Sequence, residues 1–523
     1  MKNSTFVKSV FVLALGGLIA KGVGAAYRIP LTWILGAQGL GMYQLVYPVF
    51  ALLLVISSTG TPTAISTMVA ERVGKGQYAS LPKVLRVSVG VLLGFGLLMG
   101  AMLVGLSGVL ANLQGNSEIQ ILYVIIAFAI PLVSVLSAYR GYFQGLMKMS
   151  PTAISQIIEQ LGKLAVGLGL GWFLARYGVL YATIGAVCGV VISELMAVFY
   201  ILVCYFRHKQ SSQFVDIVQT DIESTKKLLK EFFANSLPIV LCGFVLPLLQ
   251  MLDSLVVIKL LGVGGFDAQD ATMMWGIASG VVGSLINLPV ALSLSVATAV
   301  APNVRDGIAS RDDTIKKISQ AHNMAINLSL PLGVLLLCAG STIIPFLYQD
   351  SVADMGLGIS LLTLYAPFVV IIALVQMQNA VLQGLKRSKV ALTNMLVGGV
   401  CKVLALFGLS VQSQINIFGV IISNIVFYLI VCLLNYVYLH RKQLLKIGPK
   451  PIAQCAVVSA VTGVYVYIGT IAFEQIPVFW RMFVLLMIAT SVYISTLWAV
   501  GGLNGVMGLL KKLKNRVYKQ KTG

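Results

Sequence analysis

The residues best able to do chemistry are charged side chains inside long apolar runs. A charge at the centre of a lipid bilayer costs about 3 kcal/mol by insertion measurements, so such a residue either has a partner or faces water. Each one is therefore a candidate for a role in transport. Six lie within apolar runs and two more, Arg28 and Lys259, lie at the predicted outer ends of runs; the six are Lys21, Glu159, Lys163, Glu194, Asp253 and Lys402.

Two of these residues are spaced for an ion pair on a single helix. Glu159 and Lys163 are four residues apart, so they share one helix face. Their pairing can be structural, or the two can take a direct part in transport. Lys21 and Lys402 have no acidic residue within one turn, which predicts that they face an interior cavity or an acid on another helix. Asp253 is a candidate partner for either lysine.

The elements that carry these charges are predicted to be membrane-spanning helices. The 523 residues are 58% hydrophobic and only 10% charged, a composition typical of an integral membrane protein. Apolar runs of about 20 residues recur along the chain, each long enough to cross the hydrocarbon core as a helix. We predict an all-α protein with fourteen spans, centred near residues 15, 50, 97, 130, 165, 192, 245, 286, 332, 368, 400, 427, 462 and 490.

The formal net charge of +20 is distributed unevenly over the predicted loops. With the N-terminus in the cytoplasm, most of the 37 lysines and arginines fall in cytoplasmic loops, as the positive-inside rule requires. This pattern predicts a multi-pass protein of the bacterial cell membrane with both termini in the cytoplasm. We attribute the basic excess to orientation and to contact with anionic lipid, not to nucleic-acid binding.

One segment of the chain occurs twice. Residues 138–163 recur near 378–402 at a constant offset of 239, which places Gln144 and Gly145 on Gln383 and Gly384. Both copies have a basic loop before an apolar helix that carries a lysine. Two six-helix lobes in the same orientation follow, a parallel repeat about an axis along the membrane normal. The predicted parts are an N-lobe at 1–206, an amphipathic cytoplasmic linker at 207–231, a C-lobe at 232–440, two further helices at 451–502 and a basic tail at 503–523.

Lysines in both lobes predict a central cavity that attracts an anion, with alternating access as the lobes rock about it. No phosphate-binding loop and no His-Glu-x-x-His motif is present in the sequence, so we expect a transporter driven by an ion gradient or the membrane potential, not an enzyme. The seven cysteines form no Cys-x-x-Cys pair, and we expect neither a metal nor a cofactor. The predicted substrate-binding residues are Lys21, Arg28, Lys163, Lys259 and Lys402, and the candidates for coupling or ion pairing are Glu159, Glu194 and Asp253.

The run from Arg140 to Gly145, Arg-Gly-Tyr-Phe-Gln-Gly, and the segment 151–160 after it resemble a family signature. They are similar to the stage V sporulation protein B and polysaccharide-transporter branch of the multidrug, oligosaccharidyl-lipid and polysaccharide (MOP) exporter superfamily, which also includes the MurJ-type lipid II flippases. The residues that carry this signature are Arg140, Gly141, Gln144, Gly145, Pro151 and Gln156.

The resemblance implies a MATE- and MurJ-like fold and the flipping of an undecaprenyl-linked precursor, lipid II or a related glycan, from the inner to the outer leaflet. It also implies that the last two helices border a groove for the lipid tail. Lys21 falls where MurJ-type proteins carry a cavity arginine in helix 1. Those proteins also place arginines in helices 2 and 8, whereas residues 43–68 and 273–300 of this chain contain no lysine or arginine.

Two other functions stay open at this point. An ion-coupled multidrug exporter of the same superfamily would use Glu159, Glu194 and Asp253 as cation or proton sites, although such exporters usually have twelve helices. A non-transporting scaffold in envelope or spore assembly is the other, and the buried charges argue against it. We expect a monomer in contact with membrane lipid and a lipid-linked oligosaccharide, in peptidoglycan or polysaccharide biosynthesis, with spore cortex as one setting.

Overall fold

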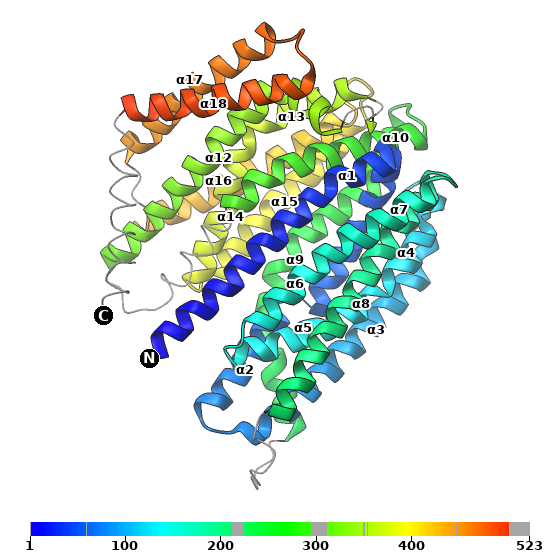
Figure 1. Cartoon of the computed structure of the whole chain (residues 1–523), viewed down its shortest axis with the longest axis vertical. Coiled ribbons are helices and arrows are strands. Elements are labelled where there is room, and N and C mark those ends of the chain that lie inside the picture. The colour runs from blue at the N-terminus through cyan, green and yellow to red at the C-terminus, as the bar shows by residue number, and fades with distance from the viewer. Residues whose placement is uncertain are drawn as a thin grey trace. The chain divides into compact units, whose positions relative to one another are not determined.

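The computed structural model describes residues 2–58, 60–211, 224–293, 311–348, 351–352, 354–445 and 448–500 (Figure 1). These residues form helices and short connections, with no β-strand among them, which confirms the predicted all-α fold class. Thirteen helical stretches of the described part are long and apolar enough to cross a membrane. Twelve of them coincide with predicted spans, and the remaining two predicted spans both fall in the first helix.

The first helix, α1 (Lys2–Ser58), is too long for one crossing. Its 57 residues would extend about 85 Å at 1.5 Å per residue, against about 30 Å of hydrocarbon. The helix is broken at Gly36, whose φ of 64° and ψ of −178° are not helical. The sequence analysis placed Arg28 at the outer end of the first span, but the helix continues past Arg28 and through Pro30. The break falls instead at the glycine, which adopts a positive φ without steric cost.

The chain divides into two compact units. The first unit holds the helices from α1 to α10, and the second holds α12, α13, α14, α17 and α18; α15 and α16 are divided between the two. The first unit thus includes α9 and α10, which the sequence analysis assigned to the C-lobe. The lobe boundaries at 206 and 232 stay a prediction.

The elements of the first unit follow in chain order (Figure 1). After α1 they are α2 (Thr61–Gly74), α3 (Leu81–Leu113), α4 (Gln120–Ala127), α5 (Ala129–Gly145), α6 (Ser150–Gly162), the π-helical turn η3 (Lys163–Gly167), α7 (Leu168–Ala175), α8 (Val179–Ser211), α9 (Thr225–Val263), α10 (Ala268–Trp275) and the π-helical turn η5 (Gly276–Val282). The packing partners of α1 within this unit include α6, α8 and α9. Residues 212–223 of the predicted linker lie outside the described part.

The later elements are α12 (Arg311–Tyr348), α13 (Met355–Tyr365), α14 (Val369–Gly384), α15 (Ser388–Ser410), α16 (Phe418–Arg441), α17 (Pro449–Ala472) and α18 (Val478–Ala499). Within the second unit, α12 packs against α14, α17 and α18. The predicted basic tail, 503–523, lies outside the described residues.

The turn of the repeated segment has the same backbone hydrogen bonds in both copies. After α5, the N–H of Lys148 donates to the carbonyl of Phe143 and the N–H of Met147 to that of Gln144, and after α14 the corresponding bonds join Arg387 to Leu382 and Lys386 to Gln383. This is the Schellman closure of a helix C-terminus. Its left-handed position is occupied by Met147 (φ 60°) and Lys386 (φ 58°), which are 239 residues apart. The shared turn fits the internal duplication, although α16 also closes in this way, at Gln443 (φ 54°).

Candidate functional site

Four charged side chains form one connected cluster in the first unit, which we call the charged tetrad: Arg140, Glu159, Lys163 and Glu194. The ammonium Nζ of Lys163 lies 2.8 Å from Oε1 of Glu159 and 3.1 Å from Oε1 of Glu194. The other oxygen of Glu159, Oε2, lies 3.0 Å from Nη2 of Arg140. Two positive and two negative groups give the tetrad no net formal charge.

Close helix packing brings the tetrad together. Gly162 is the last residue of α6 and directly precedes Lys163, and Gly167 is the last residue of the π-helical turn η3. Both glycines lie against α8. A Cβ added to Gly162 would lie 2.8 Å from Cβ of Ser193, so no larger residue fits between the two backbones. Because Lys163 follows Gly162 and Glu194 follows Ser193, the close approach sets the lysine beside the glutamate. Small residues allow this kind of contact between membrane helices, and π-helical turns often occur at functional sites.

The tetrad is buried within apolar helices. The side chain of Glu194 is 4% exposed and that of Lys163 is 14% exposed, and both lie in stretches capable of spanning a membrane. Charge pairs are stronger in such surroundings and unpaired polar groups are more costly. Both oxygens of Glu159 are engaged. Oε1 accepts from Lys163 and from Gln160, the latter at 3.1 Å, and Oε2 accepts from Arg140. Oε2 of Glu194, by contrast, has no hydrogen-bond partner among the described residues.

The predicted Glu159–Lys163 ion pair is confirmed, but it is only part of the site. The sequence analysis considered Arg140 only as a signature residue and did not connect Glu194 to Lys163. Nε of Arg140 also donates to Oγ of Ser155 at 2.9 Å, which ties α5 to α6 across the loop between them. Arg140 precedes its two partners by 15 and 19 residues. Two antiparallel helices joined by a short loop bring residues at such separations together, so these contacts could have been predicted from the sequence.

The other predicted site residues lie in varied surroundings. Lys402 on α15 is 2% exposed and Asp253 on α9 is 4% exposed, so both are buried. Arg28 on α1 is partly buried and Lys259 on α9 is exposed. Lys21 lies on α1, and its side chain is outside the described part. Binding of an anion by these residues in a shared cavity stays a prediction.

The second unit has an uncharged counterpart to the tetrad. Nδ2 of Asn394 donates to Oδ1 of Asn435 at 2.8 Å, and Nδ2 of Asn435 donates to Oδ1 of Asn379 at 3.0 Å. At the repeat offset of 239, Asn379 corresponds to Arg140 and Asn394 to Ser155. In the first copy Arg140 and Ser155 bond directly. In the second copy Asn379 and Asn394 are joined through Asn435 on α16, so amides replace the charged groups there.

The remaining signature residues shape the backbone around the site. A Cβ added to Gly141 would lie 2.7 Å from the carbonyl oxygen of Pro62, and one added to Gly145 would lie 2.5 Å from Cβ of Val69. Both glycines therefore allow α5 to pack directly on α2. Pro151 stands in the first turn of α6, where a missing N–H costs nothing. The last two signature residues, Gln144 and Gln156, are partly buried.

The sequence analysis did not find two polar links between α9 and earlier helices. Arg72 on α2 makes a two-pronged ion pair with Glu231 on α9, with distances of 3.0 Å and 2.7 Å. Nε2 of Gln114 donates to the carbonyl of Leu45 at 2.8 Å and lies 3.3 Å from Oγ of Ser254, also on α9. These residues are 69 to 159 positions apart in the chain, so no local pattern connects them.

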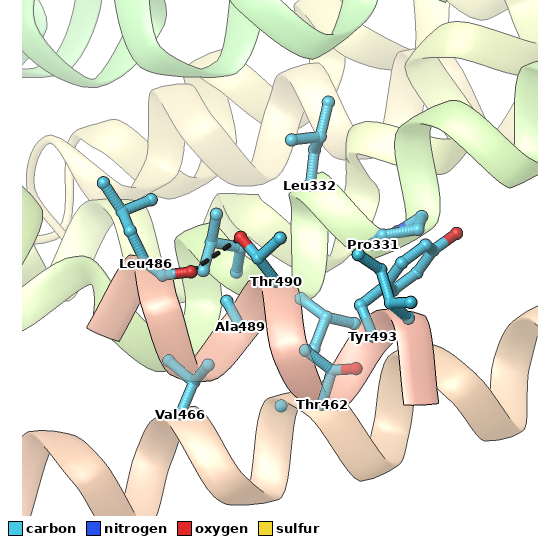
Figure 2. Close-up of a pocket in the computed structure, with 12 residues that line it drawn as sticks. Pro331, Leu332, Thr462, Val466, Leu486, Ala489, Thr490 and Tyr493 are labelled. Atoms are coloured by element: carbon cyan, nitrogen blue, oxygen red, sulfur yellow. Dashed lines mark hydrogen bonds between the residues drawn. The ribbon is translucent and has the colours of Figure 1, made fainter. Parts of the chain in front are cut away.

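An apolar groove of about 240 Å³ lies in the second unit, between α12, α17 and α18 (Figure 2). Two of its hydroxyls are already engaged, because Thr490 donates to the carbonyl of Leu486 at 2.7 Å and Thr462 to that of Val458 at 2.8 Å. The groove thus presents little free hydrogen-bonding capacity. Its lining is Pro331, Leu332, Val334, Leu335, Thr462, Gly463, Val466, Leu486, Ala489, Thr490, Tyr493 and Ile494.

Known sequences match this chain along most of its length. A family model described as polysaccharide biosynthesis protein matches residues 6–307. Stage V sporulation protein B of Bacillus subtilis (strain 168) is 26% identical over 441 residues, which is 83% of each chain. Lipid II flippase MurJ of the same organism is 26% identical over 493 residues, covering 89% of this chain and 88% of that protein.

Solved structures share the fold at low sequence identity. A structure of lipid II flippase MurJ in an inward closed conformation has a TM-score of 0.68 at 15% identity and covers 93% of this chain and 98% of its own. A multidrug resistance MATE family transporter of the MOP superfamily, in an inward-facing conformation, has a TM-score of 0.65 at 15% identity and covers 82% of this chain and 98% of its own. These likenesses show that the fold is the MurJ and MATE fold.

Proposed function

The chain belongs to the polysaccharide biosynthesis protein family, and from that premise we propose that it is a flippase for a lipid-linked cell-envelope precursor. Its substrate is an undecaprenyl-linked molecule, lipid II or a related lipid-linked oligosaccharide, which it moves from the inner to the outer leaflet. A similar protein, lipid II flippase MurJ of Bacillus subtilis, supports this class of substrate. Both termini lie in the cytoplasm, as the distribution of basic residues predicts.

The observation that carries the proposal is the apolar groove formed by α12, α17 and α18 (Figure 2). A polyprenyl chain offers only apolar surface, so its site needs apolar walls with no unpaired polar group. The groove approaches this requirement, because both of its threonine hydroxyls are bonded to backbone carbonyls of their own helices and the hydroxyl of Tyr493 is its one other polar side-chain group. The lipid tail occupies this groove while the polar headgroup crosses the membrane.

The extent of the match to the two solved structures supports a flippase over a multidrug exporter. The MATE transporter is matched over 98% of its own length yet covers only 82% of this chain, whereas the MurJ structure covers 93%. The chain therefore carries more structure in common with the flippase than with the drug transporter. The groove is built partly from α17 and α18, for which the six-helix repeat has no counterpart.

The test is flipping of fluorescently labelled lipid II in liposomes, together with growth of a strain depleted of its lipid II flippase. We expect the protein to move the label between leaflets and Ala489→Trp, which fills the groove with a bulky ring, to reduce the rate at least about tenfold, or 1.4 kcal/mol in barrier height. Met487→Trp is the matched control, because Met487 is on the same helix, is 59% exposed and is not part of the groove lining.

Each result separates the alternatives. Drug-dependent proton flux without lipid flipping would instead identify an exporter. A folded protein that moves neither drug nor lipid, and does not support growth, would favour a scaffold. Equal flipping by Ala489→Trp and Met487→Trp would remove the groove from the mechanism even if the protein is a flippase.

A further inference from the structure

We infer that Glu194 binds and releases one proton, and that this proton is the coupling ion of transport. The inference rests on the proposed function for its role in transport, while proton binding by Glu194 is measured without any substrate. Of the two glutamates in the charged tetrad, Glu194 is the one with an oxygen that no described group satisfies. It is also the more buried of the two, with its side chain 4% exposed against 15% for Glu159.

The two carboxylates differ in what they would lose on protonation. Glu159 accepts from Lys163, Gln160 and Arg140, so a proton there would disrupt charged contacts with two cations. Among the described residues Glu194 makes one ion pair, with Lys163 at 3.1 Å, through Oε1. A proton on Oε2 leaves Oε1 able to accept from the same ammonium group. Protonation of Glu194 therefore breaks fewer hydrogen bonds and ion pairs than protonation of Glu159 would.

Several charged and titratable groups surround Glu194 and determine the net charge of the site. Lys163 on η3, Glu159 on α6 and Arg140 on α5 all lie within electrostatic range of it. Among the described residues of α1, Tyr27, Tyr43 and Tyr47 lie within electrostatic range of Lys163. The hydroxyl of Tyr27 is also buried without a hydrogen-bond partner among the described residues. With Glu194 ionised the tetrad is neutral, and with Glu194 protonated it carries one positive charge.

The step balances without any other reactant. A hydronium ion from one side of the membrane gives its proton to Oε2 of Glu194, leaving water and a carboxylic acid, and water takes the proton back on the other side. Loss of the negative charge weakens the ion pair between Glu194 and Lys163, which joins α8 to η3. Helix α8 is then held to η3 less tightly, and the contact reforms when the proton leaves.

Infrared difference spectroscopy of the purified protein between buffers of about pH 6 and about pH 9 tests the site directly, because exposed carboxylates stay ionised across this range. The carbonyl stretch of a protonated carboxylic acid is expected at low pH in the wild type, absent in Glu194→Gln and unchanged in Glu118→Gln, a control at an exposed acid of the same unit. Glutamine is uncharged, nearly isosteric, and still accepts from Lys163. The wild type gives a second measurement, because a hydrophobic carbodiimide reacts with protonated buried carboxyls and mass spectrometry is expected to find the adduct at Glu194.

Liposome flipping then tests the role in transport. A pH gradient is expected to change the rate of lipid II flipping severalfold in the wild type and to leave the rate of Glu194→Gln unaffected. If the carbonyl band persists in Glu194→Gln, or the carbodiimide adduct forms at another acid, the inference is overturned even if flipping is robust. If the band belongs to Glu194 but no lipid moves, the proposed function fails and the proton site stands.

Discussion

The charged tetrad makes a quantitative prediction about folding, because its four charges depend on one another. Lys163→Met removes the one ion pair that Glu194 makes among the described residues, and the side chain of Glu194 is 4% exposed within an apolar helix. Removing one partner of a buried ion pair typically lowers the free energy of unfolding by about 3 to 5 kcal/mol, because the other charge is left uncompensated. Glu194→Leu costs less, about 2 kcal/mol, because Lys163 keeps Glu159 at 2.8 Å.

The double variant Lys163→Met/Glu194→Leu is expected to recover most of the loss. It removes one positive and one negative charge together, and the Arg140–Glu159 pair at 3.0 Å stays intact. Replacing a whole buried pair by apolar side chains of similar size is often neutral. The double variant should therefore be at least about 2 kcal/mol more stable than the sum of the single losses predicts.

Equilibrium unfolding in mixed micelles of a mild detergent and sodium dodecyl sulfate measures these free energies, with tryptophan fluorescence as the signal. The control pair is Lys259→Met and Glu118→Leu, two exposed residues whose changes should each cost less than about 0.5 kcal/mol. If Lys163→Met costs less than about 1 kcal/mol, or if the tetrad variants are additive, the four charges do not form the interdependent cluster described above.

Three further predictions concern the helices that hold the tetrad in place. Gly141→Ala should destabilise the protein by about 1 to 3 kcal/mol, because its Cβ would lie 2.7 Å from the carbonyl of Pro62, whereas Gly105→Ala, with nothing within 4 Å, should be neutral in the same unfolding assay. Arg72→Ala should cost about 1 to 3 kcal/mol by leaving Glu231 without its two-pronged partner, and the exchanged pair Arg72→Glu/Glu231→Arg should recover part of that loss. Met147→Gly should raise the free energy of unfolding by up to about 1 kcal/mol, since glycine adopts the φ of 60° without strain; an equal gain from glycine at Leu146, where φ is −78°, would refute that reason.

Sequence patterns predicted the fold more fully than the site, because the helical spans depend on neighbouring residues whereas the site depends on contacts between residues far apart in the chain. Helical spans follow from local composition, so the predicted and observed spans agree except where Gly36 breaks α1 later than expected. The Glu159–Lys163 pair is also local, since a helix brings residues four apart onto one face. The contact of Glu194 depends on how closely α8 approaches η3, which is set by the steric fit of Gly162 against Ser193. No periodicity along either helix contains that information.

The internal repeat separates what the backbone requires from what the chemistry requires. Both copies close their helix with the same hydrogen bonds and with a left-handed residue at the same position, Met147 in the first copy and Lys386 in the second. The turn is therefore a shared requirement of the fold. Glu159, however, corresponds to Gly398, where a Cβ would lie 2.6 Å from Cγ2 of Val431 and a carboxylate has no room. The amide network of the second copy does not titrate near neutral pH, whereas the first copy holds two carboxylates. If proton binding drives transport, it acts through the first copy, and substitutions in the amide network should change stability without changing the response of flipping to a pH gradient.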